Sequence, residues 1–210
     1  MRFACCSLCL VGLVLTSTSC DSPTPPDPAT TASSASVVPY NASASDGSLI
    51  QIGIAIAPVP LNLDGKNRAL VGLGSYLVNA VADCAGCHSF PQYAPGGDPH
   101  LGEPVVVNQA TYLSGGAPFF GPFIPRNLTP DAQGRPARLT LEEFLVVMNK
   151  GADLKGREPF VPSPDNDLLQ AMPWPAFSKM PDREKRAIYE YLRAIPCIGS
   201  AARCGSSGSR

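Results

Sequence analysis

Two cysteines and a histidine form the most chemically capable group in this chain. The run Cys84-Ala85-Gly86-Cys87-His88 places two thiols three positions apart and an imidazole directly after the second thiol. Thiols at this spacing can add to the two vinyl groups on one edge of a porphyrin. The imidazole then lies beneath the ring, where it can bind the iron. The pattern therefore predicts covalent attachment of one haem c at Cys84 and Cys87, with His88 as the first axial ligand.

Three other chemistries use closely spaced cysteines. A zinc site needs a second Cys/His pair, and only His100, Cys197 and Cys204 remain to supply it, without the spacing that zinc sites show. A thiol–disulfide active site expects a βαβ pattern, whereas a helix is predicted before Cys84. A structural disulfide would leave His88 without a purpose. Haem attachment is the interpretation that uses all three residues of the motif.

A thioether is the expected second axial ligand, because it favours ferrous iron and raises the haem potential. Met148 falls in the apolar stripe of a predicted helix, so core packing is its default interpretation. Met172 lies in a loop stiffened by two prolines, shortly before the last helix, and is the favoured ligand. Met180, His100 or an open position remain alternatives, and His100 is otherwise expected in a surface loop.

Apolar residues at helical spacing predict the elements that would position these residues. The helix before the motif is expected to start with Asp64 as its N-cap. Its two glycines, Gly72 and Gly74, each cost about 1 kcal/mol relative to alanine, so another helix is expected to cross closely there. A capping box and a terminal glycine bound a second helix, and Pro181 and Pro196 bound the last. The helices are expected over about residues 65–83, 140–151 and 181–195.

The segments between and before these helices have other patterns. Residues 49–64 alternate apolar with small side chains and are expected to form an extended segment packed on the domain. Residues 89–138 are irregular, with a small hairpin expected between 104–107 and 110–113. The fold class expected is therefore mainly α with long irregular loops, in one domain over residues 65–204.

The N-terminal region reads as an export signal followed by a tether. Residues 1–20 combine a short apolar core with small residues before Cys20, which resembles a lipoprotein signal. The alternative is ordinary signal cleavage with Cys20 incidental. Residues 21–48 are rich in Pro, Ser, Thr and Ala and are expected to be a disordered tether. We therefore expect a periplasmic or outer cell-surface protein, anchored by lipid to a bacterial membrane.

The C-terminus and the composition add three expectations. In an oxidising compartment Cys197 and Cys204 are expected to form a short-loop disulfide, followed by a flexible tail over residues 205–210. The formal net charge of −1, without a Lys/Arg cluster, argues against binding of nucleic acid. Paired carboxylates, a nucleophile–base pair and a nucleotide loop are all missing from the sequence, so no enzymatic activity is expected.

Several of these features together resemble a known family. A helix running into the Cys-x-x-Cys-His motif, an irregular middle and a last helix carrying Tyr191 resemble class I cytochrome c over residues 65–196. The resemblance implies an orthogonal helix bundle in which the first and last helices cross, with Gly72, Gly74 and Tyr76 against Tyr191. It also supports Met172, because the family usually places its ligand shortly before the last helix.

Shorter segments narrow the resemblance. Residues 74–80, 126–131 and 171–175 are similar to bacterial monohaem cytochromes, including subunits that accept electrons for periplasmic dehydrogenases. The resemblance implies electron transfer to and from redox protein partners, either as a free carrier or as the electron-accepting subunit of a dehydrogenase complex. The remaining alternative is an open-site haem sensor or peroxidase-like protein.

Overall fold

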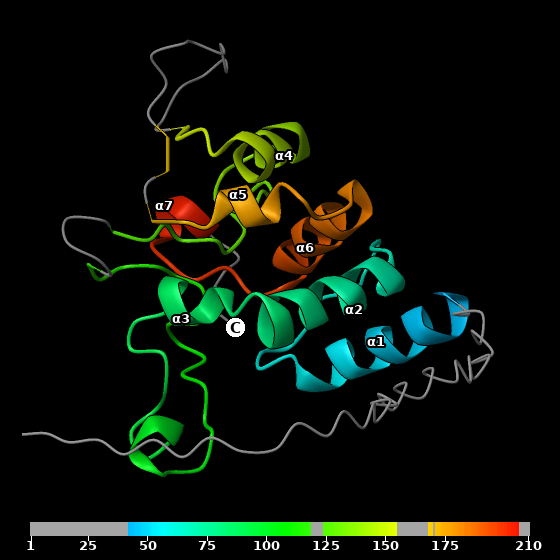
Figure 1. The fold of residues 1–210 in the computed structure, drawn as a ribbon. Helices are drawn as coiled ribbons and strands as arrows, with labels where there is room; N and C mark the ends of the chain where they lie inside the picture. The colour runs from blue at the N-terminus through cyan, green and yellow to red at the C-terminus, as the bar shows by residue number, and fades with distance from the viewer. Residues whose placement is uncertain (1–41, 119–123, 155–167, 170, 206–210) are drawn as a thin grey trace, which may run out of the picture. The chain divides into compact units, whose positions relative to one another are not determined.

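The computed structural model describes residues 42–118, 124–154, 168–169 and 171–205 (Figure 1). Over these residues the chain is mainly α, as predicted, and the extended pairing consists of isolated β-bridges. In the same residues no helix combines the length and apolar character needed to cross a membrane. The helices are α1 (Ala42–Ile56), α2 (Arg68–Tyr76), α3 (Cys84–His88), α4 (Leu141–Lys150), α5 (Trp174–Phe177), α6 (Asp182–Ala194) and α7 (Ala201–Cys204), with a π-helical turn over Leu77–Val81 and a 3₁₀ turn over Pro99–Leu101.

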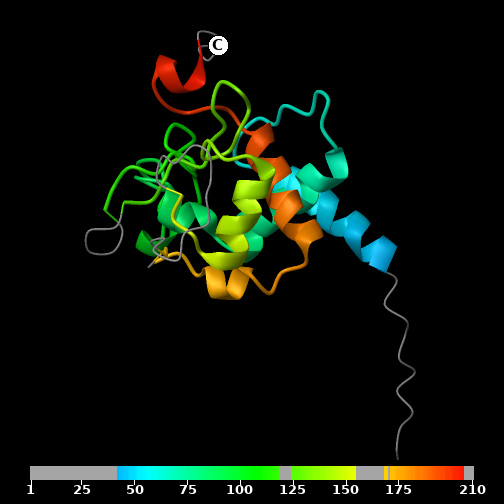
Figure 2. The ribbon, with the colours of Figure 1, turned by 90° about the horizontal axis from the view of Figure 1, so that it is seen from above.

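Helix α2 contacts both α1 and α6, as the two ribbon views show (Figures 1 and 2). On the α6 side, a Cβ added at Gly74 would lie 2.8 Å from the Cβ of Tyr191. The close approach of the last helix at Gly74 is therefore confirmed. On the α1 side, a Cβ at Gly72 would lie 2.6 Å from the carbonyl oxygen of Ile50. The expectation that Gly72 also faces the last helix was wrong, because α1 fills that side.

The expectation of an extended segment over residues 49–64 was wrong for its first half, which belongs to α1. The alternating pattern also fits a helix, because Leu49 and Gly53, like Ile50 and Ile54, are four residues apart and share one helical face. This face is less exposed to solvent than the opposite face of α1. Gly53 is buried, and a Cβ there would lie 2.8 Å from the backbone N of Tyr76. Part of the predicted tether, residues 42–48, is helical too; residues 1–41 lie outside the described chain.

The helix that leads to the motif differs from the prediction at both ends. Its N-cap is Asn67 rather than Asp64, because the Asn67 side chain accepts hydrogen bonds from the backbone N of Ala69 (3.0 Å) and of Leu70 (3.2 Å). At the other end the α-helix widens into the π-helical turn, in which the N–H of Ala82 donates to the carbonyl of Leu77 at 2.8 Å. Such turns insert one residue into a helix and are frequent at functional sites.

The predicted capping box of α4 is confirmed. The Thr140 hydroxyl accepts from the backbone N of Glu143, whose carboxylate accepts from the Thr140 N–H at 2.7 Å. Gly151 ends the helix in the left-handed conformation, with φ of 65°. Helix α6 starts one residue later than expected, because Pro181 is its N-cap and not its first helical residue.

The hairpin expected between residues 104–107 and 110–113 does not form. Val107 instead bridges Tyr93, and the Ala94 N–H donates to the Val106 carbonyl at 2.9 Å. The pairing therefore closes an arm over residues 89–113. The predicted disulfide between Cys197 and Cys204 is present, with the two Cα atoms 5.7 Å apart.

Candidate functional site

Helix α3 holds both cysteines and the histidine of the motif within a single short element. Cys84 and Cys87 are free thiols and are not bonded to one another. Asp83 precedes them in the left-handed conformation, with φ of 41°, which turns the chain between the π-helical turn and α3. A Cβ at Gly86 would lie 2.6 Å from the Asp83 carboxylate, so a larger residue there would displace that side chain. The two cysteines therefore remain available as a pair.

Both thiols are held in their protonated form. Burial raises the pKa of Cys84 to about 12, with the negative charges of Asp83 and Cys87 adding to the effect. Burial and Asp83 also raise the pKa of Cys87. Thiol–disulfide enzymes need the opposite, a thiol whose pKa is lowered. The electrostatics of α3 therefore count against a redox-active dithiol and leave two neutral thiols for addition chemistry.

His88 is oriented by a backbone carbonyl. Its Nδ1 lies 2.8 Å from the carbonyl oxygen of Arg126, and with Nδ1 donating this bond the lone pair is on Nε2. Burial lowers the pKa of His88, which keeps the ring neutral. A neutral imidazole with one nitrogen committed to a carbonyl is the usual arrangement of a metal-ligating histidine. His88 is thus prepared to ligate a metal through Nε2.

Backbone bonds fix the loops on either side of this contact. The Gly115 N–H donates to the His88 carbonyl at 2.6 Å, and the Leu113 N–H donates to the Ser89 hydroxyl at 2.9 Å. The Leu128 N–H in turn donates to the Leu113 carbonyl at 2.8 Å. Residues 111–115 therefore connect the end of α3 to the loop that supplies the carbonyl for His88.

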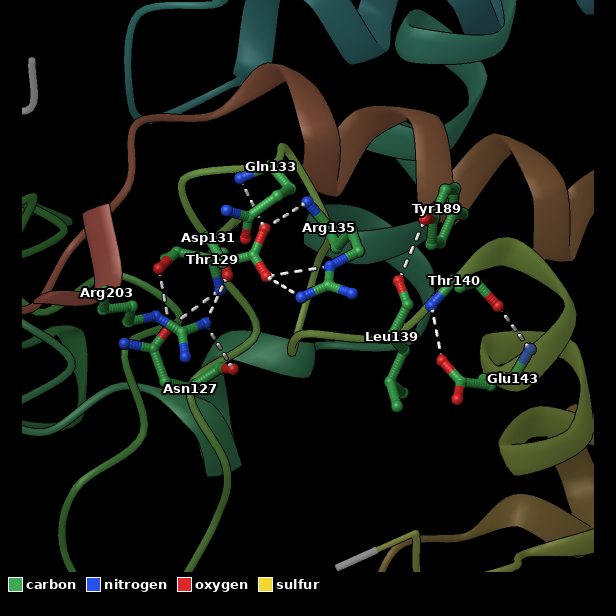
Figure 3. A network of polar contacts seen from close by, with 10 residues as sticks. All are labelled: Asn127, Thr129, Asp131, Gln133, Arg135, Leu139, Thr140, Glu143, Tyr189 and Arg203. Atoms are coloured by element: carbon green, nitrogen blue, oxygen red, sulfur yellow. Dashed lines mark hydrogen bonds and ion pairs between the residues drawn. The ribbon is translucent and has the colours of Figure 1, made fainter. Parts of the chain in front are cut away.

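A C-terminal strap, residues 197–205, holds the same loop from its other side. The Asn127 side chain donates to the Ile198 carbonyl at 2.6 Å, and the Ile198 N–H donates to the Thr129 hydroxyl at 3.1 Å. The Arg203 guanidinium donates to the carbonyls of Asn127 (3.2 Å) and Thr129 (2.5 Å), as Figure 3 shows. The disulfide closes this strap, so the segment after Arg126 is fixed by residues about 70 positions further on.

A closed ring of polar side chains lies next to Cys84. The Tyr112 hydroxyl donates to Oδ1 of the Asn79 side chain at 2.5 Å. The side-chain Nδ2 of Asn79 donates to the Tyr191 hydroxyl at 3.2 Å. Tyr191 must then donate to Tyr112 across their 2.8 Å separation, which completes the ring. Burial raises the pKa of both phenols, and Cys84 is close enough to interact with them electrostatically. Asn79 also bonds the Ser75 carbonyl at 2.9 Å, so every group in the ring is satisfied.

Sequence reasoning did not identify this ring or the Arg126 carbonyl. The π-helical turn directs the Asn79 amide to a point where it bonds both Ser75, one turn earlier, and Tyr191. The one available signal was Asn79 itself, a polar residue near the end of an apolar helical stretch. The distant partner Tyr112 has no such signal, because it comes from the irregular middle of the chain.

The other candidate ligands lie apart from α3 in the chain. Met148 is buried in the core, as expected for a residue of the α4 stripe. His100 is exposed and is the middle residue of the 3₁₀ turn, with its ring centroid 6.2 Å from that of Tyr93, which confirms the surface interpretation. Met172 and Met180 are both half-buried and pack against the core, before and after α5. Cys20 lies outside the described residues.

The donor set fits a covalently attached haem. It offers two neutral thiols and one imidazole with Nε2 free, all on a single five-residue helix. The competing zinc interpretation finds no support, since Cys197 and Cys204 are consumed by their disulfide. In the part of the chain that the structure describes, no three His, Cys, Asp or Glu side chains gather closely enough to hold a metal ion.

Comparison with known proteins also supports a covalently attached haem. The chain is 28% identical over 130 residues to the cytochrome c subunit of gluconate 2-dehydrogenase from Pantoea cypripedii, a match that covers 61% of this chain and 24% of the relative. It is 26% identical over 126 residues to the cytochrome c subunit of a quinone-type alcohol dehydrogenase from Gluconobacter oxydans (strain 621H), covering 60% and 21%. The corresponding subunit from Gluconacetobacter polyoxogenes is 28% identical over 140 residues, covering 67% and 24%.

These relatives are cytochrome c subunits of dehydrogenases, which supports a cytochrome c family for this chain and, with it, covalently bound haem c and electron transfer. The chain spans about a quarter or less of the length of the relatives it matches. No family model matches it, and neither does a solved structure.

Proposed function

We propose that this chain is an electron carrier of the class I cytochrome c type, with an orthogonal helix bundle around one haem. Cys84 and Cys87 hold the haem by thioether bonds, and His88 and Met172 ligate the iron. The observation that carries the proposal is the bond from His88 to the Arg126 carbonyl, because it leaves Nε2 free on the same short helix as two neutral thiols. When bound, the haem supplies a one-electron couple at its iron.

The chain's own residues account for attachment without a redox step. Each thiol would supply both the sulfur for a carbon–sulfur bond to one vinyl carbon and the hydrogen for the other vinyl carbon. The protonated state favoured at Cys84 and Cys87 supplies that hydrogen. The satisfied polar ring beside Cys84 keeps its hydroxyls bonded to one another, so none of them competes for the thiol.

Met172 is the second residue that we propose would ligate the iron. It is half-buried against the core in the short segment before α5, and its carbonyl accepts the N–H of Trp174 at 2.8 Å. Trp174 is fixed in turn, because its indole N–H donates to the Leu169 carbonyl at 3.2 Å and its ring packs against Gly151. A thioether held on such a segment loses little conformational freedom on ligation.

Absorption spectra of the natively exported protein test this proposal. We expect haem c bands, together with the long-wavelength thioether-to-iron band in the oxidised state. Met172→Ala should remove the thioether band, while Met180→Ala and Met148→Leu should keep it. Retention of the band in Met172→Ala with loss in Met180→Ala would reassign the ligand. Absence of attached haem in the exported wild-type protein would overturn the proposal as a whole.

Carbon monoxide separates the carrier from an open-site sensor or peroxidase-like protein. With Met172 on the iron, the reduced protein should not bind carbon monoxide in the absence of denaturant, because the sixth position is filled. Rapid binding to the wild-type protein, at the rate seen for Met172→Ala, would favour the open site.

We propose a dehydrogenase as the redox partner, since the relatives are subunits of such enzymes. The arm over residues 89–113 starts directly after His88. Two of its large apolar side chains are mostly exposed to solvent: Leu101 is 75% exposed and Val105 is 68% exposed. Exposed apolar side chains of this size suit contact with a protein partner. Leu101→Ser with Val105→Ser should slow reduction by a co-purifying dehydrogenase but leave reduction by ascorbate unchanged. Equal slowing of both reactions would contradict the docking role.

Export and lipid attachment complete the proposal: we place the chain on the periplasmic or outer cell-surface side, held to the membrane through Cys20. The support is the lipoprotein-like signal and the tether that follows it. Metabolic labelling with radioactive palmitate should mark the wild-type chain and not Cys20→Ser, which should also move from the membrane fraction to the supernatant. Equal labelling of both proteins would remove Cys20 from the proposal.

A further inference from the structure

Lys185 is a buried cation near the start of α6. Its side chain is only 3% exposed, whereas lysines are rarely buried unless they are paired. Its charge also lies near the positive end of the α6 dipole, which favours acidic rather than basic side chains. A charge buried at such a cost is expected to fix one particular arrangement of the fold.

Two side chains pair with the Lys185 ammonium. One belongs to Asp182, three residues earlier on α6, whose carboxylate lies 3.0 Å from Nζ but is itself 69% exposed. The other belongs to Asn149, in the last turn of α4, whose side-chain oxygen accepts a hydrogen bond from Nζ. Of these two contacts, the one with Asn149 reaches another element. Lys185 therefore ties the start of α6 to the end of α4.

Helices α4 and α6 also meet at the opposite end of their contact (Figure 1). The ring centroids of Phe144 and Tyr189 lie 5.4 Å apart, and the Tyr189 hydroxyl donates to the Leu139 carbonyl at 3.0 Å (Figure 3). Later residues of α6 thus face earlier residues of α4, so the two helices run antiparallel. The bond between Lys185 and Asn149 consequently fixes the end at which the chain leaves α4 and returns to start α6.

The connection between these two helix ends carries Met172, the proposed iron ligand. It is attached to the end of α4, because the Leu169 N–H donates to the Gly151 carbonyl at 2.7 Å and the Trp174 ring packs against Gly151. At its other end the connection runs directly into α6. The position of Met172 therefore depends on how the end of α4 sits against the start of α6.

We propose that Lys185 is a positioning residue for Met172. By bonding Asn149, it holds the two helix ends together and keeps the connection in the conformation that presents the Met172 thioether to the iron. The inference rests on the proposed function, in which Met172 is a ligand. Binding groups work only when supporting residues hold them close to the productive geometry. Without the bond, the helices would still meet at Tyr189, but their ends nearest Met172 would be free to separate.

Amide hydrogen exchange and carbon monoxide binding of the natively exported protein test this role. Lys185→Met is the main variant, because methionine keeps an unbranched chain but removes the charge and the donor. Asn149→Ala is the second variant and removes the acceptor on α4 instead. Tyr189→Phe is the matched control, since it removes a buried hydrogen bond of the same helix at the opposite end of the contact.

In Lys185→Met the amide hydrogens of Leu169 and Trp174 should exchange about tenfold faster than in the wild-type protein, because the connection opens locally. The reduced variant should also bind carbon monoxide without denaturant, unlike the wild-type protein, because Met172 leaves the iron more often. Tyr189→Phe should keep the wild-type behaviour in both measurements. If Lys185→Met does not fold, Asn149→Ala carries the same expectations.

Three results would overturn the proposal. Wild-type exchange at both amides in Lys185→Met would show that the bond does not hold the connection. Equal acceleration in Tyr189→Phe would show that any lost bond of α6 loosens it. Faster exchange without carbon monoxide binding would show that the ligand does not depend on Lys185. If the wild-type protein contains no haem, or its thioether band does not depend on Met172, the proposed ligation fails, and the exchange rates alone decide whether Lys185 positions the connection.

Discussion

Removing the disulfide of the C-terminal strap by Cys197→Ser and Cys204→Ser should destabilise the protein by a predictable amount. The two cysteines are seven positions apart, so the bond closes a short loop in the unfolded chain. For a loop of roughly eight residues, the chain-entropy relation gives a stabilisation of about 2.5 kcal/mol at 25 °C. We therefore expect the free energy of unfolding to fall by about 2–3 kcal/mol.

The same change should loosen the support of His88. Without the disulfide, the strap holds Asn127 and Thr129 only through hydrogen bonds, each with a net contribution of about 1 kcal/mol. The Leu128 N–H, which links this loop to Leu113, should then exchange its hydrogen faster. Local loosening is thus expected in addition to the global loss of stability.

Urea unfolding followed by circular dichroism measures the first effect, and amide hydrogen exchange measures the second. Ser200→Ala, an exposed substitution within the strap, is the control and should change stability by less than about 0.5 kcal/mol. A double serine variant with wild-type stability and unchanged exchange at Leu128 would refute the account of the strap as a support for the site.

Three further predictions follow from the helix contacts and the polar networks. Gly74→Ala should destabilise the protein by about 1–3 kcal/mol through steric overlap with α6, although alanine favours the helix itself by about 1 kcal/mol. Tyr112→Phe should lower the free energy of unfolding by about 1–3 kcal/mol, which is more than Tyr191→Phe should. Of these two substitutions, only Tyr112→Phe leaves the side-chain oxygen of Asn79 without its donor. Burial raises the pKa of Asp131, but hydrogen bonds from the backbone and the side chain of Arg135 outweigh it, so the pKa is lowered. The ionised Asp131 carboxylate should therefore stabilise the fold fully above its unfolded pKa of 3.8. This stabilisation should disappear as the pH falls through the lower pKa of the folded state. Asp131→Asn should remove the same stabilisation at neutral pH, at a cost of about 1–2 kcal/mol.

Urea unfolding is the measurement in each case. Gly47→Ala on α1 is the control for Gly74→Ala, because nothing lies within 4 Å of a Cβ there, and it should stabilise the protein by up to about 1 kcal/mol. Equal losses for Tyr112→Phe and Tyr191→Phe would contradict the direction assigned to the ring. A constant stability difference between wild-type protein and Asp131→Asn from pH 7 to pH 2 would contradict the titration of that carboxylate.

The sequence predicted those features that depend on residues near one another in the chain. The capping box of α4 needs only Thr140 and Glu143, and it forms as expected. The glycines of α2 predicted close helix contacts because a glycine within a helix is costly without one, and Gly74 does meet α6. The prediction that Cys197 pairs with Cys204 depended on their short separation and on the expectation of an oxidising compartment.

Features that depend on distant partners could not be predicted in this way. The alternating pattern before residue 57 fits a strand as well as a helix, and only the contact of Gly53 with α2 selects the helix. The carbonyl that orients His88 belongs to Arg126, 38 positions away, and a backbone group has no signature in the sequence. The bonds from Arg203 to the carbonyls of Asn127 and Thr129 likewise arise only when the fold brings the strap to the loop.

Helix α1 has a practical consequence for how a shortened form of the protein can be produced. The composition of residues 21–48 suggests that the tether could be cut anywhere before Leu49. The helix, however, starts at Ala42, and its backbone lies against the backbone of α2 at Gly53 and Gly72. A cut at residue 48 would delete nearly half of α1 and leave only a short helix to hold the contacts of Ile50 and Gly53 with α2. A well-behaved shortened protein should therefore start before Ala42.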